Sequence, residues 1–230
     1  MGRNKIVQVA IDGPAAAGKS TVAKLIADRL NYVYIDTGAM YRALTLKAYN
    51  KGINVHDGEA LENLLKETEI VLQTNQGNQT VLMDGEDVTQ AIRQKEVNEN
   101  VSFVSQHAPV RALMVDRQKK LAESANVVMD GRDIGTHVLP RADVKVFLRA
   151  SVSERAERRY KEQVAKGMTT SLKELEQEIA LRDKRDSERE VSPLVKAEDA
   201  VEIDTTSLSI EQVTDKILSL IKGADPCDAL

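Results

Sequence analysis

The sequence has 230 residues, of which 42% are hydrophobic and 30% are charged, and this is enough chain for one core with a small attached unit. Its formal net charge of -4 argues against nucleic acid and an acidic membrane as partners, because both recruit basic surfaces. No apolar run approaches the roughly 20 residues of a membrane span and no cleavable leader is visible, so we expect a cytoplasmic protein with no obligate protein partner.

Five short apolar runs alternate with segments of helical periodicity along the chain. Each run is too short for a core helix. Apolar runs without alternation are typical of parallel strands that helices cover on both faces. The sequence therefore predicts an α/β protein with a doubly wound sheet. The predicted strands are Ile6 to Ile11, Tyr32 to Ile35, Val127 to Met129, Val144 to Leu148 and Ala200 to Ile203.

Amphipathic helices are predicted after the first strand and near the end of the chain. Their hydrophobic positions are Val22, Leu25, Ile26 and Leu30 in the first helix and Ile210, Val213, Ile217 and Ile221 in the last. The last helix follows a capping box, Ser209-x-x-Gln212, and Gly223 is its predicted stop. We expect residues 223–230 to form a loose tail. This tail carries Cys227, the single cysteine, so no internal disulfide is possible and a reducing compartment fits.

A predicted hairpin interrupts the α/β alternation. Ile70 to Thr74 and Gln79 to Met83 are strand-like and flank Asn75 to Asn78, four residues of the kind that hairpin turns use. The hairpin lies between a helix capped by Asp57 and a pair of helices broken at Pro109. It is expected to be an insert in the α/β core.

The strongest motif directly follows the first strand. There the sequence reads Gly13-Pro14-Ala15-Ala16-Ala17-Gly18-Lys19-Ser20-Thr21, which satisfies G-x-x-x-x-G-K-[ST] between a strand and an amphipathic helix. Small residues let such a loop wrap around phosphates, with backbone N–H groups and a helix N-terminus directed at them. Lys19 would reach the β- and γ-phosphates of ATP. The alternative is an accidental match in a Gly/Ala-rich turn.

The residues expected to bind ATP are Asp12, Gly13, Pro14, Ala15, Ala16, Ala17, Gly18, Lys19, Ser20 and Thr21. Mg²⁺ is the expected cofactor of ATP, and the Ser20 hydroxyl is its first predicted ligand. A second carboxylate ligand should lie at the end of a neighbouring strand, where Asp130 ends an apolar run. The alternative is that Asp130 is an ordinary aspartate in the turn that begins with Gly131.

Arginines outside the loop separate a kinase from other nucleotide-binding proteins. Arg42 follows the end of the second strand and Arg132 follows the third, and open α/β sheets bind ligands at these strand ends. Arginines there would hold an acceptor phosphate and neutralise the transferring group. No Asn-Lys-x-Asp segment for guanine is present. A dense run of both signs from Arg182 to Arg189 would by itself indicate a solvated helix end.

Three further arginines follow the fourth strand. Arg155, Arg158 and Arg159 share one helical face behind a Ser151-x-Ser153 cap. They could contact the transferring phosphoryl group, but interleaved glutamates equally allow a plain ion-paired surface helix.

Taken together, these segments resemble the bacterial cytidylate kinases, over about Ile6 to Ile221. The resemblance rests on Gly13 to Thr21, Asp36-Thr37-Gly38-Ala39-Met40-Tyr41-Arg42, Asp130-Gly131-Arg132-Asp133-Ile134-Gly135-Thr136 and the block Arg182 to Arg189. It implies transfer of the γ-phosphoryl group of ATP to CMP, and we expect dCMP to serve as well. It further implies a five-stranded parallel sheet with a mobile lid at about 153–170, an acceptor-binding insert at about 55–109 and a core of 5–50, 110–152 and 170–222.

Matched position by position, the resemblance places Arg42 and Arg132 on the CMP phosphate. It places Thr37, Arg111, Asp133 and Arg189 around the cytosine, and Ser102, Arg182 and Asp186 on the ribose. The residues expected to act on the transferring group are Lys19, Asp130, Arg132, Arg155 and Arg159.

Direct in-line transfer without a protein nucleophile is the expected mechanism. Two rivals stay open: a P-loop kinase for a carbohydrate or carboxylic acid, and a non-catalytic nucleotide-binding module.

Overall fold

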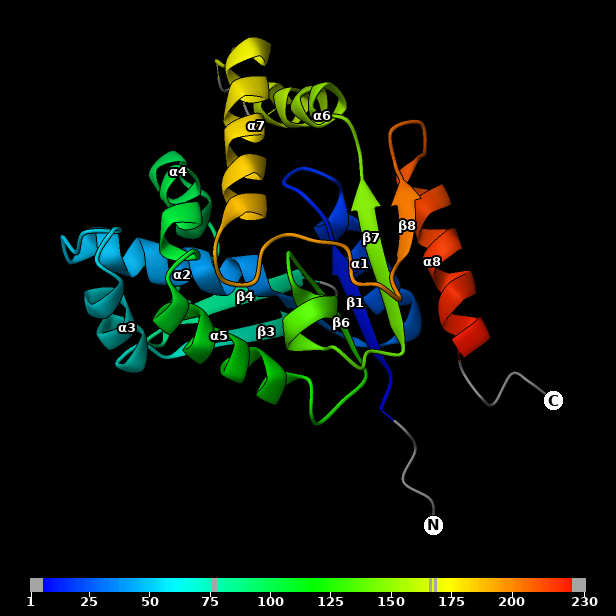
Figure 1. Cartoon of the computed structure of the whole chain (residues 1–230), viewed down its shortest axis with the longest axis horizontal. Coiled ribbons are helices and arrows are strands. Elements are labelled where there is room, and N and C mark those ends of the chain that lie inside the picture. Colours follow the sequence, from blue (N-terminus) through cyan, green and yellow to red (C-terminus); the bar gives the residue numbers. More distant parts are fainter. Residues whose placement is uncertain (1–5, 76–77, 166, 168, 225–230) are drawn as a thin grey trace.

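A five-stranded parallel sheet forms the centre of the computed structural model, which describes residues 6–75, 78–165, 167 and 169–224 (Figure 1). The strand order is β2-β6-β1-β7-β8, and each neighbouring pair is parallel. The strands are β1 (Gln8–Asp12), β2 (Val33–Asp36), β6 (Val127–Gly131), β7 (Val144–Arg149) and β8 (Val201–Asp204). All five predicted strands are confirmed, each extending one or two residues past its predicted end because polar residues there stay in the ladder.

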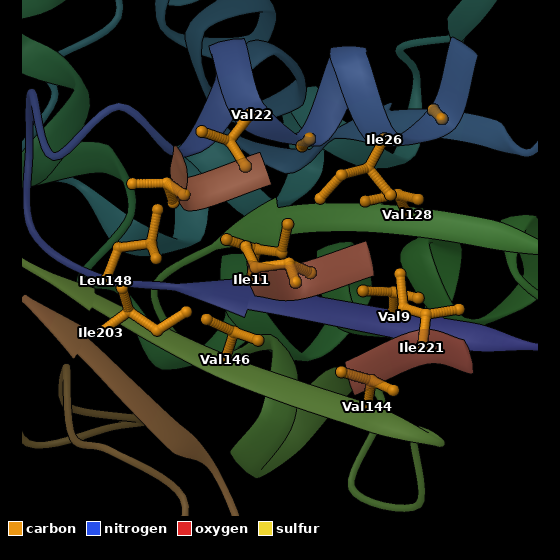
Figure 2. Close-up of a cluster of buried hydrophobic side chains, with 14 of the residues drawn as sticks. Val9, Ile11, Val22, Ile26, Val128, Val144, Val146, Leu148, Ile203 and Ile221 are labelled. Carbon is orange, nitrogen blue, oxygen red and sulfur yellow. The ribbon is translucent and has the colours of Figure 1, made fainter. Parts of the chain in front are cut away.

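Helices cover both faces of this sheet, which confirms the doubly wound arrangement. On one face, α1 (Lys19–Leu30) and α8 (Ile210–Ala224) bury side chains against alternate strand residues such as Val9 and Ile11 (Figure 2). On the other face, a second cluster packs the intervening strand residues against the end of α5 (Ala108–Leu121) and a π-helical turn, η2 (Ile134–Val138). Both faces are therefore apolar, as the unbroken hydrophobic runs predict.

The predicted hairpin forms a second sheet of its own. Strands β3 (Ile70–Asn75) and β4 (Asn78–Met83) pair antiparallel, and the two-residue strand β5 (Glu86–Asp87) extends the sheet. Asn75 pairs with Asn78, so each strand is one residue longer than predicted, and residues 76 and 77 lie outside the described part of the chain.

Helix α2 (Thr37–Asn50) links this second sheet to the first. Its residues contribute to two hydrophobic clusters, one with α3 (Gly58–Lys66), α4 (Lys95–Val104) and α5, the other with β4 and the short helix η1 (Ala91–Arg93). The cap at Asp57 is confirmed, since its carboxylate accepts the Ala60 N–H at 3.0 Å. A break between α4 and α5 is also present, but it falls at 105–107, and Pro109 lies in the first turn of α5.

Two helices, α6 (Val152–Ala165) and α7 (Leu172–Glu188), stand beyond the carboxyl ends of the sheet strands (Figure 1). They pack together through Ala156, Leu175 and Ile179. The predicted cap before α6 is present, because the Ser151 hydroxyl accepts the Glu154 N–H at 3.2 Å. These helices place charged side chains above the edge where all five strands end.

The last helix begins as predicted but does not end as predicted. The capping box is confirmed by reciprocal bonds between Ser209 and Gln212. Gly223, however, does not stop the helix, which runs to Ala224, because Gly223 is not among the glycines with positive φ. Cys227 lies outside the described residues. Among the helices of the described residues, none is long and apolar enough to cross a membrane.

Replacing Ile26 by alanine tests the packing of α1 on the sheet. Ile26 is fully buried in the cluster of Figure 2, so the free energy of unfolding should fall by about 2–5 kcal/mol, as for other large-to-small core changes. Leu181→Ala is the matched control, because Leu181 is 50% exposed on α7 and its loss should cost well under about 1 kcal/mol. If urea unfolding shows equal losses of unfolding free energy for the two variants, the packing of Ile26 in this core is contradicted.

Candidate active site

The predicted phosphate loop connects β1 to α1 in a close-fitting conformation. A Cβ at Gly13 would lie 2.3 Å from the Leu148 carbonyl oxygen, so only glycine fits this approach to β7. Gly18 caps α1 with a φ of 87° and Ala16 has a φ of 58°, a left-handed value that is unfavourable for a residue with a side chain. The first helical residue is Lys19, so the loop leads directly into the N-terminus of α1.

Lys19 is buried inside the loop. Its ammonium group donates to the Pro14 carbonyl oxygen at 2.7 Å. Burial, together with the nearby charge of Arg132, lowers the pKa of Lys19 to about 7. A desolvated ammonium group in this position gains most from a polyanion placed beside it.

Asp130 lies near the carboxyl end of β6, beside Asp36 on β2. One carboxylate oxygen accepts from the Ser20 hydroxyl and the other from the Tyr34 hydroxyl, each at 2.8 Å. Burial and the neighbouring Asp36 carboxylate raise the pKa of Asp130. The structure thus brings together Ser20 and Asp130, the two predicted Mg²⁺ ligands.

These two oxygen donors fit a magnesium ion. Mg²⁺ prefers oxygen ligands and is usually held by one or two protein groups plus water and substrate phosphates. A hydroxyl and a carboxylate at the mouth of the phosphate loop match that donor set. Elsewhere in the described part of the chain, His, Cys, Asp and Glu side chains form no group of three or more that could hold a metal.

Asp12 has a supporting role in the structure that the motif alone does not reveal. Its carboxylate accepts the N–H groups of Ile134 and Gly135 at 2.8 and 2.7 Å, which anchors the turn after β6 to the end of β1. Burial is the main cause that raises the pKa of Asp12 to about 6.

Two of the predicted phosphate-binding arginines are held by carboxylates. Arg42 donates to Asp36 at 3.0 Å and Arg132 donates to Asp186 at 2.9 Å. Burial alone would raise the pKa of Asp186, but the guanidinium groups around it, with Arg132 first, outweigh this and lower the pKa. The pair with Asp186 ties the turn after β6 to α7.

The residues predicted around the base form a second buried group. Arg111 donates to Asp133, and Arg189 lies 3.7 Å from the other oxygen of the same carboxylate. The Arg111 guanidinium also lies over the Tyr41 ring, 5.6 Å from its centroid. Asp133 is thus the partner of Arg111 from α5, and Thr37 lies nearby with its hydroxyl on the Asp130 carbonyl oxygen at 2.7 Å.

The predicted ribose residues lie on α4 and α7. Ser102 is buried on α4 and its hydroxyl lies 3.5 Å from a guanidinium nitrogen of Arg185. Arg182 on α7 is half-buried, and burial together with the charge of Arg132 lowers its pKa to about 10. Arg182 and Arg132 thus lie close enough for their positive charges to repel each other.

Several buried donors around this site have no acceptor. Seven buried side-chain polar atoms in the described residues lack a hydrogen-bond partner, and five of them are donors at this site: Tyr41 Oη, Arg42 Nε, Arg111 Nε, Arg182 Nε and Arg189 Nη2. A buried donor without a partner costs free energy, and such groups are rare in folded proteins. Their concentration here indicates a polar ligand that supplies the missing acceptors.

The three arginines of α6 separate into different environments. Arg155 is buried and donates to the Ala150 and Ala15 carbonyl oxygens and to Asp183. Arg158 binds Glu154 and Thr205. Arg159 makes a 3.4 Å ion pair with Glu162, and its side chain is 35% exposed. The three arginines therefore do not act as one set, and a contact with the transferring phosphoryl group stays a prediction.

Sequence reasoning missed several residues that shape the site. Tyr34 on β2 orients Asp130, Tyr41 contributes an unpaired hydroxyl, and Asp183 holds Arg155. Tyr34 carries a usable signal, since it lies two residues before Asp36 in a parallel strand and points to the same face. Asp183 offers none, because it is one charge within a dense run.

A family model and curated relatives of this chain carry the same family description. A family model described as "Cytidylate kinase" matches residues 9–223. The chain is similar to the cytidylate kinase of Geobacillus kaustophilus (strain HTA426), 59% identical over 215 residues that cover 94% of this chain and 96% of that protein. It is equally similar to the cytidylate kinase of Bacillus subtilis (strain 168), 59% identical over 218 residues, 95% and 97% of the two chains. Among solved structures, an uncharacterized protein from Eubacterium ventriosum ATCC 27560 shares the fold, with a TM-score of 0.51, 13% identity and coverage of 95% and 99%.

Replacing Asp12 by asparagine tests the buried carboxylate through pH. Its pKa is about 6 in the folded protein and 3.8 as the ordinary value, so the folded state binds this proton more tightly than the unfolded chain. Stability should therefore fall by about 2 kcal/mol through this group as the pH rises from about 4 to 7. Asparagine does not titrate. The free energy of unfolding of Asp12→Asn minus that of wild type should therefore increase by that amount as the pH rises over this range. If urea unfolding shows the same difference in unfolding free energy between the two proteins across this pH range, the raised pKa of Asp12 is contradicted.

Proposed function

The chain belongs to the cytidylate kinase family, whose reaction is the transfer of the γ-phosphoryl group of ATP to CMP, and we propose that it performs this reaction at the carboxyl edge of its five-stranded sheet. CMP is the acceptor and dCMP is a second one. The partners of this site are these small nucleotides, and neither nucleic acid nor a membrane takes part.

The donor ATP binds along the phosphate loop. The loop N–H groups and the N-terminus of α1 face the phosphates, and Lys19 exchanges the Pro14 carbonyl oxygen for phosphate oxygens. Ser20 and Asp130 hold the Mg²⁺ that accompanies ATP, which neutralises phosphate charge. Tyr34 keeps the Asp130 carboxylate in place.

The acceptor phosphate binds between Arg42 and Arg132. Both guanidinium groups reach this position from strand ends and are held by Asp36 and Asp186, so little side-chain freedom is lost when the phosphate binds. Arg159 on α6 is the arginine with the exposure needed to approach the transferring group.

The nucleoside binds beyond the acceptor phosphate. Cytosine presents an exocyclic amine, which the Asp133 carboxylate can accept, and ring acceptors, toward which Arg111 and Arg189 can donate. Thr37 lies at the same strand edge. Ser102, Arg182 and Asp186 hold the ribose hydroxyls.

Catalysis in this proposal is positioning and electrostatics. The acceptor oxygen attacks the γ-phosphorus in line and ADP leaves, so no covalent enzyme intermediate forms. Lys19, Arg132 and Arg159 neutralise the charge that spreads over the transferring phosphoryl oxygens. The lid at about 153–170, which includes most of α6, closes over both nucleotides and excludes water, which would otherwise take the phosphoryl group.

The observation that carries this proposal is the set of five buried donors without an acceptor. They lie on Tyr41 and on four of the arginines predicted to hold CMP. A non-catalytic nucleotide module needs only the phosphate loop, whereas a second anionic ligand with a polar base explains these donors.

Replacing Asp133 by asparagine tests base recognition. The carboxylate accepts from the cytosine amine but repels the uracil carbonyl at the same position, whereas an asparagine amide can donate to uracil. The ratio of kcat/KM for CMP to that for UMP should therefore fall at least about tenfold, mainly through loss of CMP activity. Steady-state assays of both acceptors at saturating ATP measure it.

Asp116→Asn is the control for this change. Asp116 lies on α5, as Arg111 does, but its side chain is 59% exposed and pairs with Lys120 on the surface of the same helix, so its replacement should leave the ratio at the wild-type value. An unchanged ratio in Asp133→Asn would move base recognition to another residue and leave Asp133 as the structural partner of Arg111.

A further inference from the structure

Arg155 joins the phosphate loop to the helices above it. The side chain is 4% exposed, and each of its three guanidinium nitrogens already has a protein partner. Nε donates to the Ala150 carbonyl oxygen and Nη1 to the Ala15 carbonyl oxygen, both at 3.0 Å. Nη2 forms a 2.5 Å ion pair with Asp183 on α7. The guanidinium thus binds the end of β7, the phosphate loop and α7 at the same time.

The bond to the Ala15 carbonyl oxygen holds the peptide group that leads into Ala16, a residue with an unfavourable backbone conformation. In a trans peptide the carbonyl oxygen and the following N–H point in opposite directions, so fixing the Ala15 carbonyl on Arg155 directs the Ala16 N–H away from α6. Ala16 has a φ of 58°, and this left-handed conformation costs a residue other than glycine about 1–2 kcal/mol. An external bond is therefore needed to keep this peptide in its observed orientation.

An apolar contact supports the same part of the loop. The Ala16 side chain packs against the cluster that α6 and α7 form from Ala156, Leu175 and Ile179. The loop therefore contacts the two helices at consecutive residues, through the Ala15 carbonyl oxygen and the Ala16 methyl group. Loop shape and helix position depend on each other at this contact.

We propose that Arg155 is a positioning residue for ATP: it orients the Ala15–Ala16 peptide, with Asp183 holding its guanidinium in place, and so presets the phosphate loop before the donor binds. This replaces the direct contact with the transferring phosphoryl group that the sequence predicts for Arg155. The inference rests on the proposed function in taking ATP as the ligand of the loop.

The test must separate loop positioning from fold stability. Arg155→Met alone would leave the Asp183 carboxylate, which is 20% exposed, without its partner, and an unpaired carboxylate that is mostly shielded from water destabilises a protein, whereas replacing both members of such a pair by apolar residues is often neutral or stabilising. The paired variant Arg155→Met/Asp183→Leu therefore removes the bond to Ala15 while keeping the core filled. Its melting temperature should stay near that of wild type.

Binding is measured on the enzyme without turnover. Calorimetric titration with β,γ-imido-ATP should show about tenfold to a hundredfold weaker affinity in the paired variant, the effect of losing a charged hydrogen bond that orients the site. CMP affinity should stay within about twofold, because the acceptor residues keep their own partners. In kinetics, KM for ATP should rise while KM for CMP does not.

Arg158→Gln is the matched control. Arg158 lies one turn further along α6 and binds Thr205 rather than the phosphate loop, so its loss should leave β,γ-imido-ATP affinity near wild type. Wild-type affinity in the paired variant, equal losses for both nucleotides, or an equal loss in Arg158→Gln would each overturn the proposal. Failure of the proposed function itself is distinguishable, since the wild-type enzyme would then bind no β,γ-imido-ATP or transfer no phosphoryl group to CMP.

Discussion

Buried carboxylates at the carboxyl edge of the sheet are tolerable only where guanidinium, ammonium or N–H groups neutralise them. The parallel register sets Asp36 beside Asp130 and ends β1 at Asp12, so three carboxylates meet at one edge. Asp12 accepts two N–H groups, Asp36 binds Arg42, and Asp130 accepts two hydroxyl groups. These partners come from α1, α2, β2 and η2, so the carboxylates tie those elements to the edge.

The pairing of carboxylates with guanidinium groups also orients the site for anionic ligands. Arg111 and Arg132 are held by Asp133 and Asp186 before any nucleotide arrives, so their orientation is set in advance. The named site residues still include six cations (Lys19, Arg42, Arg111, Arg132, Arg182 and Arg189) against five carboxylates (Asp12, Asp36, Asp130, Asp133 and Asp186). Two polyanions brought together at this edge relieve that excess, and the arrangement suits transfer between two phosphates better than transfer to a neutral sugar.

Much of this structure could be predicted from the sequence where the signal is local. The strand runs, the strand–loop–helix context of the phosphate loop and the Ser209 capping box depend on neighbouring residues and are confirmed. Gly223 was a wrong stop, because a glycine ends a helix only when it adopts positive φ. Contacts between distant segments carry no local signal: Arg155 meets Ala15 across 140 positions, and Arg111 was assigned to the base only through the resemblance. The roles of the site residues stay proposals that the geometry supports.

The central claim is that one edge of the sheet holds two nucleotides and moves a phosphoryl group between them. A carbohydrate or carboxylic acid kinase would use the same loop with fewer arginines around the acceptor. The most direct measurement is a coupled assay of ADP formation by the wild-type protein, with ATP and Mg²⁺ and with CMP, UMP, AMP or shikimate as acceptor. We expect the highest kcat/KM for CMP and no turnover with shikimate. Preference for another acceptor, or nucleotide binding without turnover on any of them, would contradict it.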